Sequence, residues 1–197
     1  IIFFGVLFFL AYITILSWGT WWGILWLLVY GNIYYCAPNF QHETNHQTFF
    51  KSRWLNKLFY NIFSVMCSFE QYRFKWSHFH HHSYTISTTV EDYDYENNTP
   101  RPTEPIRFLI NFLPLGPILN IQKMRHFTQM EIIRHALGYT SPVMKISVPK
   151  SEISKVKISS IIHVLFWLFA VLLSFYFQSL LPVLMLVLVP FYGNTLE

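Results

Sequence analysis

The chain has 197 residues, which is enough for one domain. Hydrophobic residues make up 53% of it and charged residues only 12%, whereas ordinary soluble domains are about 25% charged. This composition sets the chain apart from soluble enzymes and predicts a membrane protein. The formal net charge is +4, but the Lys and Arg residues are scattered among aromatic residues, which argues against a nucleic-acid partner. Such a basic surface fits anionic headgroups or an acidic protein partner.

Two apolar segments at the start of the chain predict a membrane hairpin. Residues 1–18 carry no charge and would reach about 27 Å as a helix, close to the roughly 30 Å hydrocarbon core. Gly19 and Thr20 can turn the chain. Residues 21–36 predict a second span, with tryptophans near the turn forming an interfacial belt.

The end of the chain predicts a second hairpin. Residues 158–177 are uncharged and apolar, and residues 180–192 begin a further apolar segment. All 14 Lys and Arg residues lie within residues 51–157, so the positive-inside rule places that segment in the cytoplasm. The predicted fold class is therefore all-α and integral to the membrane, a single domain with four transmembrane helices in two hairpins (1–36 and 158–193) and a helical cytoplasmic cap (37–157).

The cytoplasmic segment contains three further predicted helices. Apolar residues at helical spacing in residues 54–66 predict an amphipathic helix, which lies either on the membrane or under the rest of the domain. Residues 73–82 predict the next helix and residues 123–137 a third. The acidic run 91–96 and the turn-rich segment 97–102 between them are not expected to be helical.

Four histidines among residues 78–82 predict a metal site. Successive residues of an α-helix are about 100° apart, so His78, His81 and His82 fall within an arc of roughly 100°, while His80 points to the opposite side. Neutral imidazole is the commonest protein ligand for transition metals. We expect three of these side chains to converge on metal, and His80 to lie behind the ligands or at the surface.

A second histidine pair lies upstream of this cluster. His42 and His46 are one helical turn apart on one face. With Glu43 they also match the H-E-x-x-H pattern of zinc metalloproteases, in which the glutamate is the general base. A protease would leave the downstream cluster without a role, and five imidazoles exceed what one four-coordinate zinc needs. Two metal ions fit this number of ligands better, and a di-iron site with open positions can activate O₂.

The two histidine motifs, HxxxH and, about 30 residues later, HxxHH, are flanked by hydrophobic hairpins. This arrangement resembles the membrane fatty acid desaturase family. Residues around the boxes share the resemblance, namely Glu43, Thr48, Phe49, Trp76, Ser77, Tyr84 and Thr85. Residues 134–138, before the second hairpin, resemble the bacterial branch.

The resemblance implies an O₂-dependent membrane lipid oxidase, most simply a fatty acyl desaturase. Two iron ions would be held by five imidazoles of this chain together with a third box of the family, and O₂ would be the co-substrate. The substrate would be a fatty acyl lipid. Electrons would come from a ferredoxin or cytochrome b5-like donor, because no flavin, nicotinamide or haem motif occurs in the chain. The resemblance favours the bacterial inner membrane over the endoplasmic reticulum, with the boxes on the cytoplasmic side. The implied ligands are His42, His46, His78, His81 and His82.

The family also has a third box, another HxxHH beyond the second hairpin, and this chain reaches Glu197 before one occurs. We expect the missing box to lie downstream of a truncated sequence. On that expectation, the 197 residues alone would be inactive and bind fewer than two iron ions per chain.

Metal-bound imidazoles usually donate their other N–H group to a carboxylate or carbonyl. Glu43, Asp92 and Asp94 are therefore candidate partners of the ligands, and His80 is a further candidate behind them. The two aspartates equally fit a solvated acidic turn.

The remaining histidines are expected not to bind metal. His126 and His135 are nine residues apart, about 180° around a helix, so they cannot form a pair on one face. His163 lies alone in an apolar span, where a hydrogen-bonded core histidine is the simplest interpretation, although an ionisable residue inside a membrane is by default a functional hypothesis.

Three alternatives to a desaturase stay open at this point. A lipid or alkane hydroxylase would use the same boxes, since both reactions begin with hydrogen abstraction. An integral-membrane zinc metalloprotease would use His42, Glu43 and His46 alone. A membrane metal-binding or transport protein would need no O₂.

Overall fold

The computed structural model describes residues 2–96, 105 and 129–189. Within these residues the regular elements are all helical, which confirms the all-α prediction. Several predictions lie outside the described residues: the turn-rich segment 97–102, His126, the first part of the helix at 123–137 and the end of the fourth span.

The first hairpin consists of α1 (Ile2–Leu16) and α2 (Trp21–Tyr34), which pack along each other. Thr20 caps α2 by accepting a hydrogen bond from the backbone N–H of Gly23. The chain approaches itself so closely here that a Cβ atom on Gly23 would lie 2.5 Å from the carbonyl oxygen of Ser17. Only glycine fits that position without a clash, so the glycine at position 23 is what permits this tight turn.

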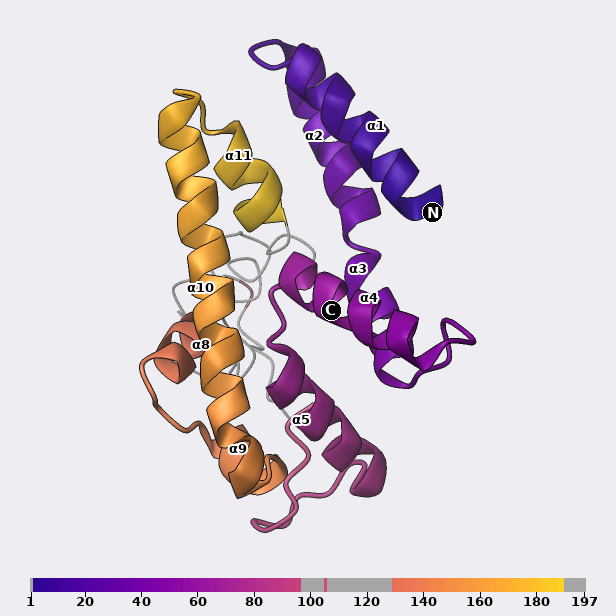
Figure 1. The fold of residues 1–197 in the computed structure, drawn as a ribbon, viewed down its shortest axis with the longest axis vertical. Helices are drawn as coiled ribbons and strands as arrows, with labels where there is room; N and C mark the ends of the chain where they lie inside the picture. The colour runs from indigo at the N-terminus through magenta and orange to yellow at the C-terminus, as the bar shows by residue number, and fades with distance from the viewer. Residues whose placement is uncertain (1, 97–104, 106–128, 190–197) are drawn as a thin grey trace.

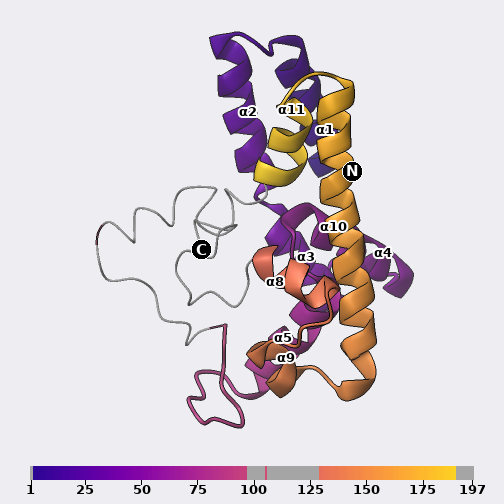
Figure 2. The same ribbon diagram turned by 90° about the vertical axis from the view of Figure 1, so that its left-hand side faces the viewer.

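The second hairpin pairs α10 (Ile153–Tyr176) with α11 (Leu181–Val183), which continues as a π-helix over Leu184–Leu188. Figures 1 and 2 place α1, α2, α11 and the C-terminal half of α10 together at one end of the molecule. Among the described residues, only the helix Lys150–Tyr176 is long and apolar enough to cross a membrane, and α1 is a shorter apolar helix. Four membrane spans therefore stay a prediction.

Below the first hairpin, α3 (Ala37–Asn45) packs against α4 (Arg53–Cys67). The side chain of Gln41 is completely buried between them and donates hydrogen bonds to Ser64 Oγ at 2.8 Å and to the carbonyl of Phe69 at 3.2 Å. Buried polar groups are stable only when hydrogen-bonded, so this network fixes the rotation of α3 about its axis. The same network therefore also orients His42, the next residue in the chain.

The opposite end of the molecule contains α5 (Gln71–Ser83), α8 (Gln129–Ala136) and α9 (Pro142–Ser147). The N-terminal half of α10 packs against α8 and α5, and α9 packs against α5. Glu70 begins α5, because its carboxylate accepts hydrogen bonds from the backbone N–H groups of Tyr72 and Arg73. Ser159 of α10 donates its hydroxyl to the same carboxylate, so one buried acid joins the two helices.

Glu70 makes the stability of this joint dependent on pH. Burial raises the pKa of its carboxyl group to about 7, against the opposing effect of the capping N–H groups and Arg73. An acid whose pKa is raised by folding stabilises the fold while it is protonated, and this contribution is lost as pH rises towards 7. Glu70→Gln resembles the protonated acid at every pH. We therefore expect its free energy of unfolding, relative to that of the unsubstituted protein, to rise by roughly 3 kcal/mol between about pH 4.5 and pH 7.

Thermal unfolding of the purified protein between about pH 4.5 and pH 7.5 measures this difference. Glu152→Gln, which changes a partly exposed acid paired with Lys155, is the matched control and should leave the pH profile unchanged. Parallel profiles for the unsubstituted protein and Glu70→Gln would mean that Glu70 is ionised throughout this range.

Candidate metal centre

The two histidine motifs meet at the contact between α3 and α5. His42 lies in the last turn of α3, and His46 is its C-terminal cap. The Nε2 atom of His46 lies 2.9 Å from Nε2 of His78, and Nε2 of His82 lies 3.0 Å from the same atom. One ligand atom from each of four histidines, His42, His46, His78 and His82, lies within 4.8 Å of the other three.

The donor set fits a transition-metal ion. Three imidazole nitrogens at these distances would repel one another through their lone pairs unless a cation or a proton lay between them. Bonds of about 2.1 Å that meet at a right angle place two ligand nitrogens about 3.0 Å apart, whereas a tetrahedral angle places them about 3.4 Å apart. The observed separations of 2.9 and 3.0 Å are close to what two ligands of one ion, or two imidazoles that share a proton, would show.

Carboxylates support the imidazoles of α5 from behind. Nδ1 of His78 lies 3.0 Å from Glu96 Oε2, and Nδ1 of His81 lies 3.0 Å from Asp94 Oδ2. A carboxylate at Nδ1 holds the proton there, so that Nε2 carries the lone pair a metal needs. This is the arrangement found behind metal-binding histidines.

Asp94 is held in place by the loop that follows α5. It is 1% exposed and accepts hydrogen bonds from the backbone N–H groups of Ile86 and Glu96. Burial alone would raise the pKa of Asp94, but these bonds and the one from His81 outweigh burial and lower it. The carboxylate is therefore a fixed negative charge behind His81.

The first box has its own carboxylate partner. Glu43 Oε1 lies 3.1 Å from Nδ1 of His42, and Thr48 Oγ1 donates to Glu43 Oε2 at 2.9 Å. The hydrogen bond from Thr48, followed by that with His42, lowers the pKa of the exposed Glu43 carboxyl group. Glu43 thus holds the ring of His42 in place. The general base of a protease does not need such a contact.

The sequence comparison agrees with this geometry. The family model described as Fatty acid desaturase matches residues 3–196. The chain belongs to the fatty acid desaturase family. The family resemblance is therefore confirmed, and the family implies a membrane-associated oxidoreductase that acts on lipids. No curated protein and no solved structure matches the chain.

The structure places the other predicted site residues as follows. His81 is held by Asp94 and lies outside the group of four histidines. Asp92 makes no hydrogen bond with a histidine among the described residues. Of the two predicted aspartates, only Asp94 contacts a histidine there. The ring of His80 packs against Tyr84 with 4.8 Å between ring centres, and its Nε2 is buried without a described partner.

Glu96 is the site residue that the sequence interpretation missed. It belongs to the same acidic run as the two aspartates, but nothing in the run itself shows how far the loop reaches back towards α5. Ser77 Oγ also contacts this carboxylate, at 3.3 Å from Oε1. Only the returning loop brings Glu96 to His78.

Two further histidines are buried away from the group of four. His163 of α10 is completely buried and has its ring nitrogens next to the carbonyl oxygens of Ser159, at 2.8 Å, and Ser64, at 3.2 Å. His135 lies 4.0 Å from Glu131, which pairs with Arg73 of α5 at 3.4 Å. Burial, followed by the charge of Arg73, lowers the pKa of His135 to about 3, so this imidazole is neutral.

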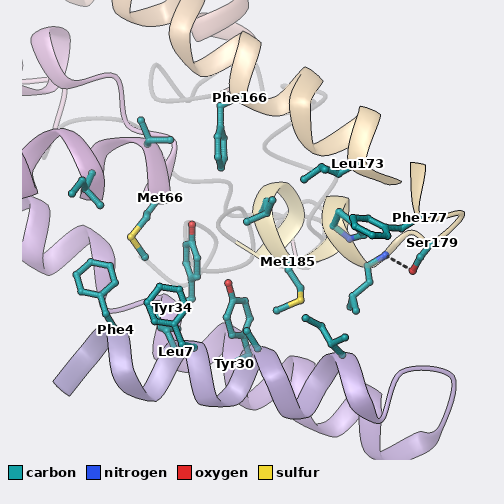
Figure 3. A pocket seen from close by; sticks show the side chains of 18 of the residues that line it. Phe4, Leu7, Tyr30, Tyr34, Met66, Phe166, Leu173, Phe177, Ser179 and Met185 are labelled. Carbon is teal, nitrogen blue, oxygen red and sulfur yellow. Dashed lines mark hydrogen bonds between the residues drawn. The ribbon is translucent and has the colours of Figure 1, made fainter. Parts of the chain in front are cut away.

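A separate apolar cavity of about 940 Å³ lies between the two hairpins and α4. Tyr30 and Tyr34 of α2 point their hydroxyl groups towards it, as Figure 3 shows. None of the histidines that the structure describes lines it. Phe4 and Met66, which do line it, also pack against the core formed by Ala37, Phe63 and Cys67, beneath α3.

Proposed function

We propose that the protein is an O₂-dependent fatty acyl desaturase with a di-iron centre held by the imidazoles of the two boxes. Its substrate is a fatty acyl lipid of the membrane, and its product contains a new C=C bond. The observation that carries the proposal is the meeting of His46, His78 and His82 at one point, with carboxylates behind His78 and His81.

The residues divide between two ions. We assign His42, His46, His78 and His82 to one ion, because one ligand atom of each lies within 4.8 Å of the other three. His81 lies outside that group, yet it has the supporting carboxylate of a ligand, so we assign it to the second ion. We infer that the third histidine box implied by the family resemblance completes the ligands of the second ion, while positions stay open for O₂.

When bound, iron supplies the O₂-derived oxidant that removes hydrogen from an unactivated C–H bond. The chain's own residues prepare that site. Glu96 and Asp94 hold the protons on Nδ1 of His78 and His81, so both imidazoles present Nε2 to the ion. Thr48 orients Glu43, which fixes the His42 ring in the same way.

The setting of the centre supports a lipid substrate and an external electron donor. The apolar helix Lys150–Tyr176 and the first hairpin provide the membrane part, in which water-poor acyl chains are available. Exposed basic residues near the start of that helix, Lys145 and Lys150, fit a cytoplasmic face and an acidic donor such as a ferredoxin. We place the boxes on that cytoplasmic side of a multi-pass protein.

Lipid analysis of cells expressing the full-length gene product tests the reaction. We expect acyl chains lighter by two hydrogen atoms than those of cells with an empty vector, because desaturation removes two hydrogens. Chains heavier by one oxygen atom would instead assign the protein to the hydroxylases that share these boxes, and would overturn the desaturase proposal.

A substitution at His81 separates the oxidase from the zinc protease. A protease that uses His42, Glu43 and His46 should tolerate His81→Ala, whereas a di-iron oxidase should lose its lipid product. The same lipid analysis measures this, and peptide cleavage that persists in His81→Ala without any lipid product would support the protease.

A further inference from the structure

The cavity between the hairpins is built like a hydrocarbon-binding site. Its described lining contains no charged residue and comes from α1, α2, α4, α10 and the α11 region. Its volume of about 940 Å³ is within the usual range for small-molecule sites. Burial of hydrocarbon against such a surface is favourable in proportion to the area removed from water.

One wall of the cavity is the exposed apolar face of α4. Leu58, Ile62 and Val65 of this helix line the cavity, and the first two are 45% and 36% exposed. Trp54 lies one turn before Leu58 on the same face and is 65% exposed. The apolar face therefore continues beyond the cavity towards the start of α4.

A row of basic residues runs beside this apolar face. Arg53, Lys57 and Asn61 are each four residues apart, so they form a ridge along α4, and Asn61 lines the cavity. Arg53 and Lys57 are exposed and have no ion pair or hydrogen bond among the described residues. No acidic residue occurs in α4 to neutralise them.

We propose that the cavity and the Arg53–Lys57 ridge together bind an anionic phospholipid. One acyl chain occupies the cavity, and the phosphate lies against Arg53 and Lys57 at the membrane surface. An amphipathic helix with an aromatic residue, aliphatic residues and adjacent cations is suited to the headgroup region. Cations near an anionic headgroup each strengthen binding by about fivefold.

The charge of the ridge favours a phospholipid over a soluble acyl carrier. A phosphodiester has one negative charge, which two cations can balance, whereas an acyl-coenzyme A thioester brings several charges. A bilayer lipid also reaches a cavity between apolar helices by lateral diffusion alone. This site shares no residue with the metal centre, so lipid binding needs no iron and goes beyond the proposed function.

Native mass spectrometry of the purified protein with phosphatidylglycerol and phosphatidylcholine tests the headgroup part. We expect the protein to prefer phosphatidylglycerol, and Arg53→Gln with Lys57→Gln to reduce that preference by roughly tenfold or more. Lys75→Gln with Arg134→Gln removes the same charge from exposed positions on α5 and α8 and is the matched control. A preference that survives in the first double variant, or falls equally in both, overturns the proposal.

A substitution inside the cavity tests the acyl-chain part. Ala11 lines the cavity, so Ala11→Phe should lower retention of both lipids, whereas Val171→Phe, on the exposed side of α10, should not. Unchanged lipid retention in an Ala11→Phe protein that unfolds at the usual temperature contradicts the proposal. Displacement of phosphatidylglycerol by palmitoyl-coenzyme A at lower concentration than by phosphatidylglycerol itself would assign the site to a soluble thioester and overturn the phospholipid.

Discussion

Replacing His78 by alanine in the full-length gene product is expected to abolish desaturation and to weaken iron binding more than about a hundredfold. The Nε2 atom of His78 lies within 3.0 Å of the corresponding atoms of both His46 and His82, so its removal opens the centre of the site. Loss of a ligand should cost more than loss of its carboxylate partner, which typically costs about tenfold to a hundredfold. Iron per chain and lipid product, measured on the same preparation, report the two effects.

His82→Ala and His80→Ala make this test specific. His82 is exposed, so its replacement disturbs packing little, and it should lose iron as His78→Ala does. His80 packs against Tyr84 on the other side of α5, and His80→Ala should keep both iron and activity. If His78→Ala and His80→Ala retained iron equally, the group of four histidines would not be the metal centre.

Asp94→Asn and Glu96→Gln are expected to weaken iron binding by about tenfold to a hundredfold each, acting through the imidazoles that they contact. Each substitution keeps the size of the side chain but removes the negative charge that holds a proton on Nδ1 of an imidazole. Asp94→Asn should also destabilise the loop after α5, because that carboxylate accepts the N–H groups of Ile86 and Glu96. Iron affinity by competition with a chelator measures the first effect, and thermal unfolding the second.

Asp92→Asn is the matched control for these two variants. It removes the same charge from the same acidic run, but Asp92 has no hydrogen bond to a histidine among the described residues. We expect its iron affinity to stay within about twofold of the unsubstituted protein. An equal loss in Asp92→Asn would show that the run acts through its total charge rather than through contacts with individual imidazoles.

Local patterns in the sequence were sufficient for the helices that carry the boxes. The helix predicted at residues 73–82 is α5, Gln71–Ser83, and the one predicted at 54–66 is α4, Arg53–Cys67. Helical periodicity also places His78 and His82, one turn apart, on one face, because it depends only on neighbours along the chain. For the same reason it directs His80 away from them.

Contacts between distant segments were beyond such patterns. His46 and His78 are 32 residues apart, and their meeting depends on how α3 packs on α4 through Gln41. The sequence also did not show that the acidic run folds back towards α5, because loop geometry rather than periodicity brings Glu96 to His78. The sequence interpretation therefore chose Asp92 and omitted Glu96.

The sequence by itself determined the all-helical class, the family and the presence of two histidine boxes, since these follow from composition, spacing and helical period. Only the tertiary structure decided which imidazoles lie close together, which carboxylates hydrogen-bond to them, and that α4 turns an apolar face towards a cavity between the hairpins. The physical reason is that ligand and cavity geometry arise from packing between helices, and packing depends on side chains far apart in the chain.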